Sequence, residues 1–507
     1  MTRKENVFKN IRTSVIGEVI HIALGFITRG VFLKILGTEY LGINTLFADI
    51  VDMLALTELG IGSSIIFSMY KPINDRDEKR ICALMHFFKT VYRYIALAIT
   101  IFGLAIMPFL SGMMKEVPQD INIYLLFGLY LCRTIASYLF AAYKAALIRA
   151  DQKVYVLNRI YNVYIILTNI VQIVVLYVTK DFVLYTASFI VSNILQNIYI
   201  ARTCDKMYPF SKDKDFKRLD KAEQMSLFKD ASVLFMYEVN NKVYNSVDNI
   251  ILSRFIGLAI VGVYSNYMLV VSNIKKLMDL VFNSLASSIG NLNVTSSNER
   301  KMEVFFVINY FCFIAFGVVA IGFMNCVNPF IEVWLGRSLL LPMGIVFVKT
   351  VELYIYGINK NVVTFRHNMG LFRFKKYMPL YSALLHIVLA LVLVRYWGLF
   401  GVVIATLVSI LTTLSVFDPI IVFRNGFNTS PVKFFGYNFY YIFIMIVCAL
   451  ASNYLCSLVP YGGFIQFVIC GIISVMVTLV IMVVFTFRQR EFKYLVNIIK
   501  KDILKLG

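Results

Sequence analysis

Residues 11–36 read IRTSVIGEVIHIALGFITRGVFLKIL, an apolar stretch that carries charges inside it. Because roughly 20 mainly apolar residues are enough for a helix to cross a bilayer, the stretch predicts a membrane-spanning helix. At an advance of about 100° per residue, Glu18, His21 and Arg29 fall on one face of that helix. Ionisable groups inside a bilayer cost about 3 kcal/mol or more each, and they usually face a wet, protein-lined interior. The polar stripe therefore predicts a transport pathway beside this helix.

The composition of the whole chain is that of a membrane protein. Of its 507 residues, 59% are apolar and 15% are charged, whereas soluble proteins average roughly 45–50% and about 25%. The net charge is +20, which would suit a nucleic-acid partner, but the positive charges follow a topological pattern instead. We therefore expect an all-α integral membrane protein that binds no nucleic acid.

Apolar stretches of spanning length recur along the chain. They lie near residues 13–36, 41–69, 84–110, 121–143, 155–179, 183–202, 231–256, 259–290, 304–328, 340–365, 377–396, 398–423, 434–457 and 463–487. This pattern predicts about 14 transmembrane helices.

Lys and Arg are distributed very unequally between the two sides that these spans define. Segments on the side of the N-terminus hold 33 of them, and segments on the opposite side hold 5. Since cytoplasmic loops carry the excess of positive charge, both termini are predicted to be cytoplasmic. The predicted outer loops are all short, which leaves no room for a catalytic domain, so we expect the protein not to be an enzyme.

Motifs for metal or nucleotide chemistry are weak or missing in the sequence. The eight cysteines show no CxxC spacing, and His86, His367 and His386 show no HExxH spacing. The DxD pattern of residues 213–215 lies in a mixed-charge stretch without an α/β domain around it, so we expect a solvated loop. No GxxxxGK[ST] motif occurs. We expect no metal and no cofactor, and any uphill transport is expected to use a proton or sodium gradient.

A short repeat relates two halves of the chain. Residues 37–43, GTEYLGI, resemble residues 257–263, GLAIVGV, at an offset of 220. The same offset carries the polar stripe onto a second helix, since Glu18, His21, Gly25 and Arg29 correspond to Glu238, Asn241, Asn245 and Asn249. Two halves of equal topology are an established transporter plan, with the substrate site between them.

The repeat and the charge pattern together predict the domain organisation. We expect an N-lobe at 1–203 with spans 1–6, a cytoplasmic linker loop at 204–229, a C-lobe at 230–428 with spans 7–12, and spans 13–14 with a basic cytoplasmic tail at 429–507. The two lobes are expected to be pseudo-symmetric six-helix bundles around a central cavity.

Cationic side chains within the predicted spans are the candidate substrate-binding residues: Arg29, Arg133, Lys242, Lys275, Lys276 and Lys349. A cavity lined by cations suits an anionic group such as a phosphate or pyrophosphate. The alternative is that such charges pair between helices or along one helix. Lys349 and Glu352, at positions i and i+3, could simply pair.

Acidic side chains within the spans are the candidates for an ion-coupled step. We select Glu18 with its repeat partner Glu238, and we add Asp248. Both copies of the polar stripe keep the glutamate, whereas only the first copy keeps a cation. This asymmetry predicts that the glutamates serve a mechanism shared by the two halves and that Arg29 serves an anionic cargo.

Residues 36–72, LGTEYLGINTLFADIVDMLALTELGIGSSIIFSMYKP, carry a family resemblance. Their LGxxx[YL]G turn and the later LGIGSS run resemble the polysaccharide exporters of the multidrug/oligosaccharidyl-lipid/polysaccharide exporter (MOP) superfamily, and most of all its Wzx-type flippases of O-antigen and capsule repeat units. The resemblance implies a multi-pass protein of the bacterial cytoplasmic membrane with a cationic cavity between two lobes. It implies transport of undecaprenyl-pyrophosphate-linked oligosaccharides from the inner to the outer leaflet by alternating access. Membrane lipid, a polysaccharide polymerase and glycosyltransferases are the implied partners.

Other functions stay open at this point. A lipid II flippase fits the same anionic chemistry, and a multidrug or cation antiporter of the superfamily shares the fold but usually favours an acidic cavity. A polymerase or ligase would need a larger outer loop with catalytic groups. A scaffold without transport would leave the charges within the spans unexplained.

Overall fold

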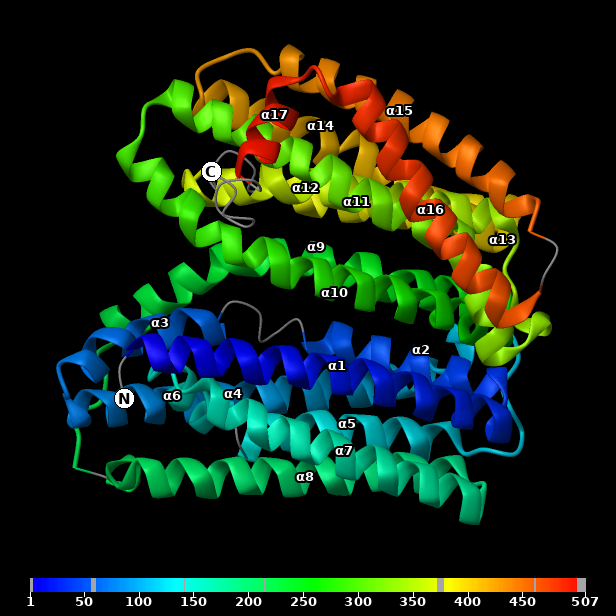
Figure 1. Ribbon diagram of the computed structural model, residues 1–507. Helices are drawn as coiled ribbons and strands as arrows, with labels where there is room; N and C mark the ends of the chain where they lie inside the picture. The colour runs from blue at the N-terminus through cyan, green and yellow to red at the C-terminus, as the bar shows by residue number, and fades with distance from the viewer. Residues whose placement is uncertain are drawn as a thin grey trace. The chain divides into compact units, whose positions relative to one another are not determined.

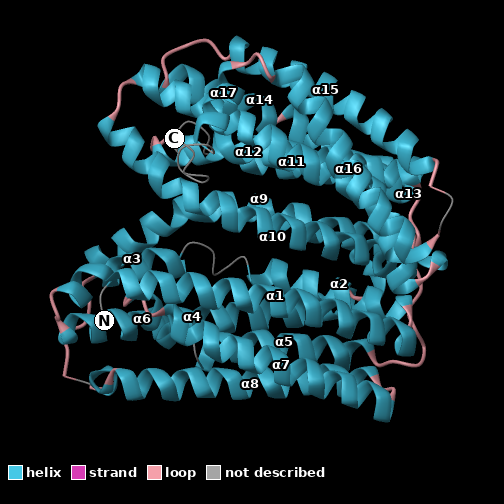
Figure 2. Cartoon of the chain, viewed as in Figure 1, coloured by secondary structure: helices cyan, strands magenta, loops and turns pink. Residues whose placement is uncertain are grey.

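The computed structural model of the protein describes residues 3–55, 61–140, 142–213, 215–371, 378–459 and 462–498 (Figure 1). Within its helices, the side chains at 3–8, 11, 61, 63, 140, 212, 229–243, 245, 283–288, 291, 293–295 and 498 are not among those described. All regular structure in these ranges is helical, as Figure 2 shows. The expected all-α fold class is confirmed.

Residue contacts divide the chain into two compact units, 1–262 and 263–507. The helices of the first unit are α1 (Arg3–Leu36), α2 (Thr38–Leu54), α3 (Ile61–Asn74), α4 (Glu78–Ile106), α5 (Ile123–Phe140), α6 (Ala142–Ala150), α7 (Val154–Thr179), α8 (Phe182–Met207) and α9 (Lys221–Phe255). Helix α10 (Leu258–Thr295) begins in the first unit and continues into the second. The second unit also holds α11 (Asn298–Leu335), α12 (Met343–Asn368), α13 (Met378–Thr412), α14 (Leu414–Ile421), α15 (Val432–Ser457), α16 (Gly463–Thr486) and α17 (Arg490–Ile498).

Many of these helices can cross a membrane. Among the described residues, nine helices are long and apolar enough to do so, or ten if the bent pair α5 and α6 forms one span. Helices α9 and α12 are long enough but do not reach this apolar threshold. Both coincide with predicted spans and carry buried charges, so a count from hydropathy alone is low where polar side chains lie inside the protein. The number 14 stays a prediction.

Helix α13 contains two passes rather than one. Gly398 has φ 57° and ψ −133°, a backbone conformation that interrupts the helix. The hydroxyls of Ser382 and Thr413 lie 2.7 Å apart, whereas 31 residues of continuous helix would separate them by about 46 Å. The chain therefore reverses at Gly398, where the short turn between residues 396 and 398 was predicted.

Helix directions in the first unit agree with alternating passes. Along α1 and α7, Asn10 Oδ1 accepts from the Tyr155 amide at 2.6 Å and Thr28 Oγ1 donates to Asn169 at 2.6 Å. Because both residue numbers rise together, these two helices are parallel, as the first and fifth passes must be. Helices α5 and α8 are parallel too, since Arg133 lies over Phe189 and, one turn further along both helices, Ser137 donates to Asn193.

Helix directions in the second unit agree as well. Asn325 of α11 donates to Ser474 of α16 at 2.9 Å, and Tyr310 of α11 contacts Thr486 of α16 at 2.6 Å. The residue numbers run in opposite senses, so these helices are antiparallel, as the predicted ninth and fourteenth passes must be. The C-terminal helices α15 and α16 therefore pack on α11 as an integral part of this unit.

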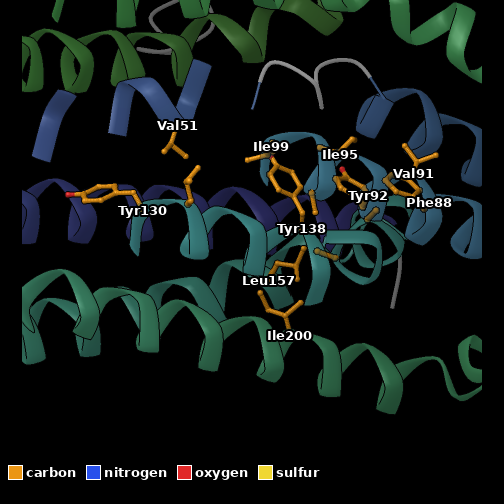
Figure 3. Packing of buried hydrophobic residues seen from close by; sticks show 14 of the residues in the cluster. Val51, Phe88, Val91, Tyr92, Ile95, Ile99, Tyr130, Tyr138, Leu157 and Ile200 are labelled. Carbon is orange, nitrogen blue, oxygen red and sulfur yellow. The ribbon is translucent and has the colours of Figure 1, made fainter. Parts of the chain in front are cut away.

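Aromatic rings fill much of the interior of each unit. In the first unit Phe88 stacks on Tyr92 with ring centroids 5.1 Å apart, and Tyr92 stacks on Tyr138 at 5.7 Å (Figure 3). In the second unit Phe305 is fully buried and lies 5.1 Å from Phe365. Since lipid is as apolar as these side chains, close packing holds the helices together.

The segment predicted as a cytoplasmic linker is packed against the first unit. The Phe210 carbonyl accepts from Cys82 Sγ at 3.2 Å, and the ring of Phe216 lies 5.4 Å from His86. Arg80 binds both carboxylate oxygens of Glu223, at 2.6 and 3.1 Å. These contacts hold the start of α9 on α4, so α9 lies in the first unit although the repeat relates it to α1.

Tyr208 begins this packed segment and fixes it to the end of α6. Its hydroxyl donates to the Asp151 carboxylate at 2.6 Å. Burial and this hydrogen bond raise the pKa of Tyr208, so the hydroxyl stays a donor at neutral pH. Within the DxD pattern, the exposed Asp215 carboxylate pairs with Lys79 at 3.1 Å.

Candidate functional site

Part of the polar stripe of α1 is accessible. His21 is exposed, and a Cβ built on Gly25 would meet no atom within 4 Å. On the opposite face, a Cβ at Gly17 would lie 2.2 Å from the Asn162 side chain of α7. Helix α1 therefore packs on α7 through the face that carries Gly17. The stripe of Glu18, His21 and Arg29 remains at least partly accessible.

Two predicted arginines meet the same helix in the first unit. The guanidinium of Arg29 lies within electrostatic range of Tyr185 on α8. The guanidinium of Arg133, from α5, lies 4.5 Å from the ring centroid of Phe189. Tyr185 and Phe189 are four residues apart, which is about 6 Å along the helix axis. The fold thus brings these two side chains, 104 residues apart in sequence, to neighbouring turns of α8.

Neighbouring aromatic side chains support this pair. Phe32 is one turn beyond Arg29 and packs on Tyr185 with centroids 5.1 Å apart. Tyr130 lies one turn before Arg133 and donates its hydroxyl to Asn44 of α2. These contacts fix the elements that carry the two guanidiniums, so that the site does not depend on loops.

An acidic residue completes the charge pattern of this region. Asp52 of α2 is exposed and lies within electrostatic range of Arg133. Exposed charges in the middle of membrane helices cannot face lipid cheaply, so the surface that carries them faces water. The region therefore holds two partly buried cations and one exposed carboxylate.

Helices α2 and α9 are joined by polar contacts. The Asn249 amide donates to the Asp49 carboxylate at 2.6 Å, and the Ser246 hydroxyl lies 3.5 Å from its other oxygen. The predicted coupling residue Asp248 is buried on α9, with 3% of its surface exposed, within electrostatic range of Asp49. The side chains of two other predicted residues, Glu238 and Lys242, lie outside the described residues.

Lysines and carboxylates gather on α10 and α12 in the second unit. The Lys275 ammonium lies 4.8 Å from the ring centroid of Tyr356, whose hydroxyl donates to both oxygens of Asp279 at 2.8 Å. Lys360 pairs with the same carboxylate at 2.7 Å. Lys276 is exposed beside this cluster. The charges in the cluster balance only partly, so the region keeps a positive excess.

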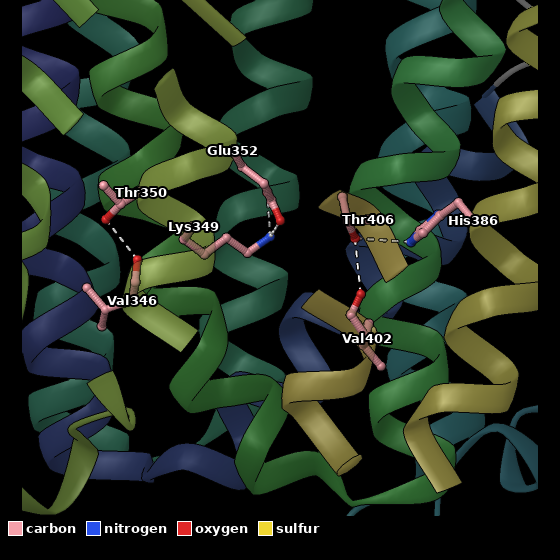
Figure 4. A network of polar contacts seen from close by, with 7 residues as sticks. All are labelled: Val346, Lys349, Thr350, Glu352, His386, Val402 and Thr406. Carbon is pink, nitrogen blue, oxygen red and sulfur yellow. Dashed lines mark hydrogen bonds and ion pairs between the residues drawn. The ribbon is translucent and has the colours of Figure 1, made fainter. Parts of the chain in front are cut away.

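Lys349 is buried in an ion pair. Its ammonium contacts both oxygens of Glu352, at 2.9 and 3.1 Å, and lies 5.4 Å from the ring of Tyr264 (Figure 4). The geometry is the one expected if Lys349 and Glu352 pair with each other along one helix. In this conformation the Lys349 ammonium is therefore paired with a carboxylate and buried.

Two buried polar pairs of the second unit did not enter the predicted site. Arg366, the residue after the predicted span at 340–365, lies in α12 with 2% exposure and pairs with Asp418 at 2.6 Å. His386 is fully buried, and its Nε2 lies 3.2 Å from Thr406 Oγ1 (Figure 4). No local spacing reveals such pairs, because their members are 52 and 20 residues apart. Within the described ranges no cluster of three His, Cys, Asp or Glu side chains could hold a metal ion.

Comparison with known proteins identifies the family. A family model described as polysaccharide biosynthesis protein matches residues 7–286, more than half of the chain. The chain belongs to this polysaccharide biosynthesis protein family. The matched residues run from α1 into α10 and include both arginines beside α8. No curated protein is similar enough in sequence to match the chain.

Solved structures share the fold of this family member at low sequence identity. A lipid II flippase, MurJ, in an inward closed conformation, is 16% identical with a TM-score of 0.64, covering 95% of this chain and 99% of its own. An inward-facing multidrug resistance MATE transporter of the MOP superfamily is 12% identical with a TM-score of 0.61, covering 80% and 94%. A MOP superfamily transporter from Pyrococcus furiosus is 14% identical with a TM-score of 0.54, covering 83% and 96%. The family match and this shared fold confirm the resemblance to MOP-type exporters.

Proposed function

We propose that this protein is a flippase that moves undecaprenyl-pyrophosphate-linked oligosaccharide repeat units, of the capsule or O-antigen kind, across the cytoplasmic membrane by alternating access. Family membership supports a role in polysaccharide biosynthesis. The fold shared with MurJ and MATE transporters supports a transport step in preference to a catalytic one. The observation that carries the proposal is the placement of Arg29 and Arg133 on neighbouring turns of α8.

Two arginines at this spacing suit a pyrophosphate. Guanidinium groups bind phosphate oxygens bidentately through charge-assisted hydrogen bonds. Such contacts are worth more where protein and lipid exclude bulk water, because the effective dielectric constant is lower there. In this account Arg29 and Arg133 hold the pyrophosphate, and Lys275 and Lys276 stay proposed substrate-binding residues. Lys242 and Lys349 remain proposed contributors in another conformation.

Ion coupling belongs to the same proposal. Glu18, Glu238 and Asp248 are the proposed coupling residues, for a proton or sodium gradient. Glu18 lies on the same face of α1 as Arg29, so the cargo and the coupling ion would act on one helix. The orientation with both termini cytoplasmic rests on the excess of Lys and Arg on that side. A polysaccharide polymerase and glycosyltransferases are the proposed partners that consume and supply the substrate.

A lipid II flippase is the second candidate function. The observation that favours it is the structural match with MurJ, which covers 95% of this chain, against 80% for the MATE transporter. Both candidate cargoes present a polyprenyl pyrophosphate, so the same arginines would serve either. The two candidate cargoes differ in their sugar part. The surface polymer that the host loses when transport fails therefore tells them apart.

The test replaces Arg29 by Ala in the host strain. Loss of the guanidinium should abolish surface polysaccharide while the protein stays in the membrane, as immunoblotting of membranes would show. The exposed Arg93, on α4, is the matched control, and Arg93→Ala should leave the polymer intact. Normal polymer in the Arg29→Ala strain would remove the arginine site, and cell lysis in place of polymer loss would favour the lipid II candidate.

A further inference from the structure

The Asp49 carboxylate links the second helix of the chain to the ninth. It accepts hydrogen bonds from Asn249, which is 7% exposed, and from Ser246, which is 2% exposed. Both partners are neutral, and the contact to Ser246, at 3.5 Å, is at the long limit for a hydrogen bond. A carboxylate inside a membrane is thus held by two neutral donors on a different helix.

The charges around Asp49 favour exchange of its proton. Asp52 on α2 and Asp248 on α9 are the like charges within its electrostatic range. Three other helices, α1, α4 and α5, pack against α2. Arg133 of α5 lies within electrostatic range of Asp52, and Arg29 of α1 lies within electrostatic range of Tyr185. The described charged groups of α4 are confined to residues 78–93. Two neighbouring carboxylates make the charged form of a third more costly. The repeat places Asn249 where the first copy has Arg29, so the described partner of Asp49 at this position is an amide. The side chain of Lys242, on the same face of α9, lies outside the described residues.

A reciprocal contact between glycines lies at the end of α2 that adjoins α1. A Cβ at Gly42 would lie 2.1 Å from the Leu258 carbonyl oxygen, and a Cβ at Gly262 would lie 2.1 Å from the Thr38 carbonyl oxygen. The repeat offset of 220 relates Thr38 to Leu258 and Gly42 to Gly262. The contact is therefore symmetric in the two repeats, as at an isologous interface. Backbone meets backbone there, and no side chain fits.

The corner between α9 and α10 is held by a third set of contacts. The Lys115 amide donates to the Ser253 carbonyl at 3.0 Å, and the Ser253 hydroxyl donates to the Met113 carbonyl. Arg254 donates to the Met114 carbonyl at 3.3 Å. Residues 110–120 form a predicted outer loop, so the corner is held to this loop at the predicted outer side.

We infer that this docking is reversible and that Asp49 is a coupling carboxylate which holds it closed when ionised. The inference rests on the proposed transport function, because alternating access needs helices such as α2 and α9 to part and meet again. An ionised carboxylate accepts charge-assisted hydrogen bonds, about twice as strong as neutral ones. A proton from water that binds Asp49 removes the charge and one acceptor oxygen, which weakens the bonds from Asn249 and Ser246. The glycine contact then separates without breaking any side-chain packing.

Accessibility of Ser253 measures the docking directly. Ser253 of α9 is fully buried, whereas Gly112, in the predicted outer loop at 110–120, is exposed. Ser253→Cys and Gly112→Cys, each in a cysteine-free background, are labelled with a membrane-impermeant maleimide on intact cells. The ratio of the two rates cancels the pH dependence of the thiol reaction. We expect this ratio to rise roughly tenfold from about pH 8 to about pH 5.5, the factor that corresponds to losing one bond to a charged group.

Variants of Asp49 decide the outcome. Asp49→Asn, which mimics the protonated form, should give the high ratio at both pH values, and Glu39→Gln, at an exposed position of the same helix, should keep the pH response. Gly42→Ala should also give the high ratio at both pH values, whereas Gly322→Ala, with no atom within 4 Å, should not. If Asp49→Asn does not reach the membrane, Asn249→Ala replaces it, with a raised ratio at about pH 8 expected.

Several results would overturn the inference. They are a ratio independent of pH in the parent, a pH response that persists in Asp49→Asn, and labelling of the Ser253→Cys variant only in inside-out vesicles. The assay contains no substrate, so its result is separate from that of the proposed function. A pH-dependent ratio in a protein that moves no lipid-linked oligosaccharide would retain the role of Asp49 and reject the cargo.

Discussion

At the residue scale, the chain separates charges that neutralise each other from charges that stay accessible. Lys349 with Glu352 and Arg366 with Asp418 are buried ion pairs of the second unit. Arg29, Arg133 and Lys276 instead keep exposed surface. Accessible surface, which an anionic cargo can reach, distinguishes these three cations from the two buried pairs.

The Lys349–Glu352 pair yields a prediction about stability. Lys349→Ala leaves a buried carboxylate without its cation, so it should lower the free energy of unfolding by about 3–5 kcal/mol. The double variant Lys349→Met with Glu352→Leu keeps the volume and removes both charges, so it should unfold near the parent temperature. Thermal unfolding of the purified protein in detergent checks both. A double variant as unstable as the single one would show that the pair does more than neutralise its own charges.

How much the sequence could predict differs from residue to residue. The i, i+3 spacing of Lys349 and Glu352 is visible in the sequence because it lies within one helix. The meeting of Arg29 and Arg133 at α8 is not, because it depends on how three helices far apart in sequence pack. The sequence does not distinguish Asp49 from the other carboxylates within the spans. Its contact with Asn249, 200 residues away, is seen only in the fold.

At the element scale, hydropathy locates helices well and their continuity poorly. Among the described residues, every predicted span overlaps a helix, because long apolar runs have few alternatives in a membrane. The turn at Gly398 is a single residue between two apolar runs, and the structure has one helical element there with a reversal inside it. The central loop was predicted as a linker from its charge, but its Phe210 and Phe216 pack on α4.

The reversal at Gly398 can be tested with a cysteine pair. Ser382→Cys with Thr413→Cys, in a cysteine-free background, should cross-link readily under mild oxidation because the native hydroxyls lie 2.7 Å apart. Leu380→Cys with Thr413→Cys is the control, since Leu380 is exposed on the lipid side and should not cross-link. Cross-linking is read as a mobility shift that a reductant reverses. Equal yields from the two pairs would contradict the hairpin.

At the scale of the whole molecule, the chain repeats one plan and then departs from it. The glycine motifs at 37–42 and 257–262 recur with positive φ at Gly37 and Gly257. The polar stripe does not recur in full, since Arg29 corresponds to Asn249. The shared features suit a mechanism common to both halves, and the unshared arginine suits a cargo. Contacts, however, place α9 with the first unit, which the repeat alone did not indicate.

The central claim is that the protein moves a polyprenyl-pyrophosphate-linked oligosaccharide by means of its accessible arginines. The direct measurement is transbilayer movement of a fluorescent undecaprenyl-pyrophosphate oligosaccharide in proteoliposomes, followed by quenching from outside. The account predicts rapid movement with the parent protein and with Arg93→Ala, and a loss of at least about tenfold with Arg29→Ala or Arg133→Ala, in keeping with one lost charge-assisted contact. Movement no faster than in protein-free liposomes, or movement that both arginine variants leave unchanged, would contradict it.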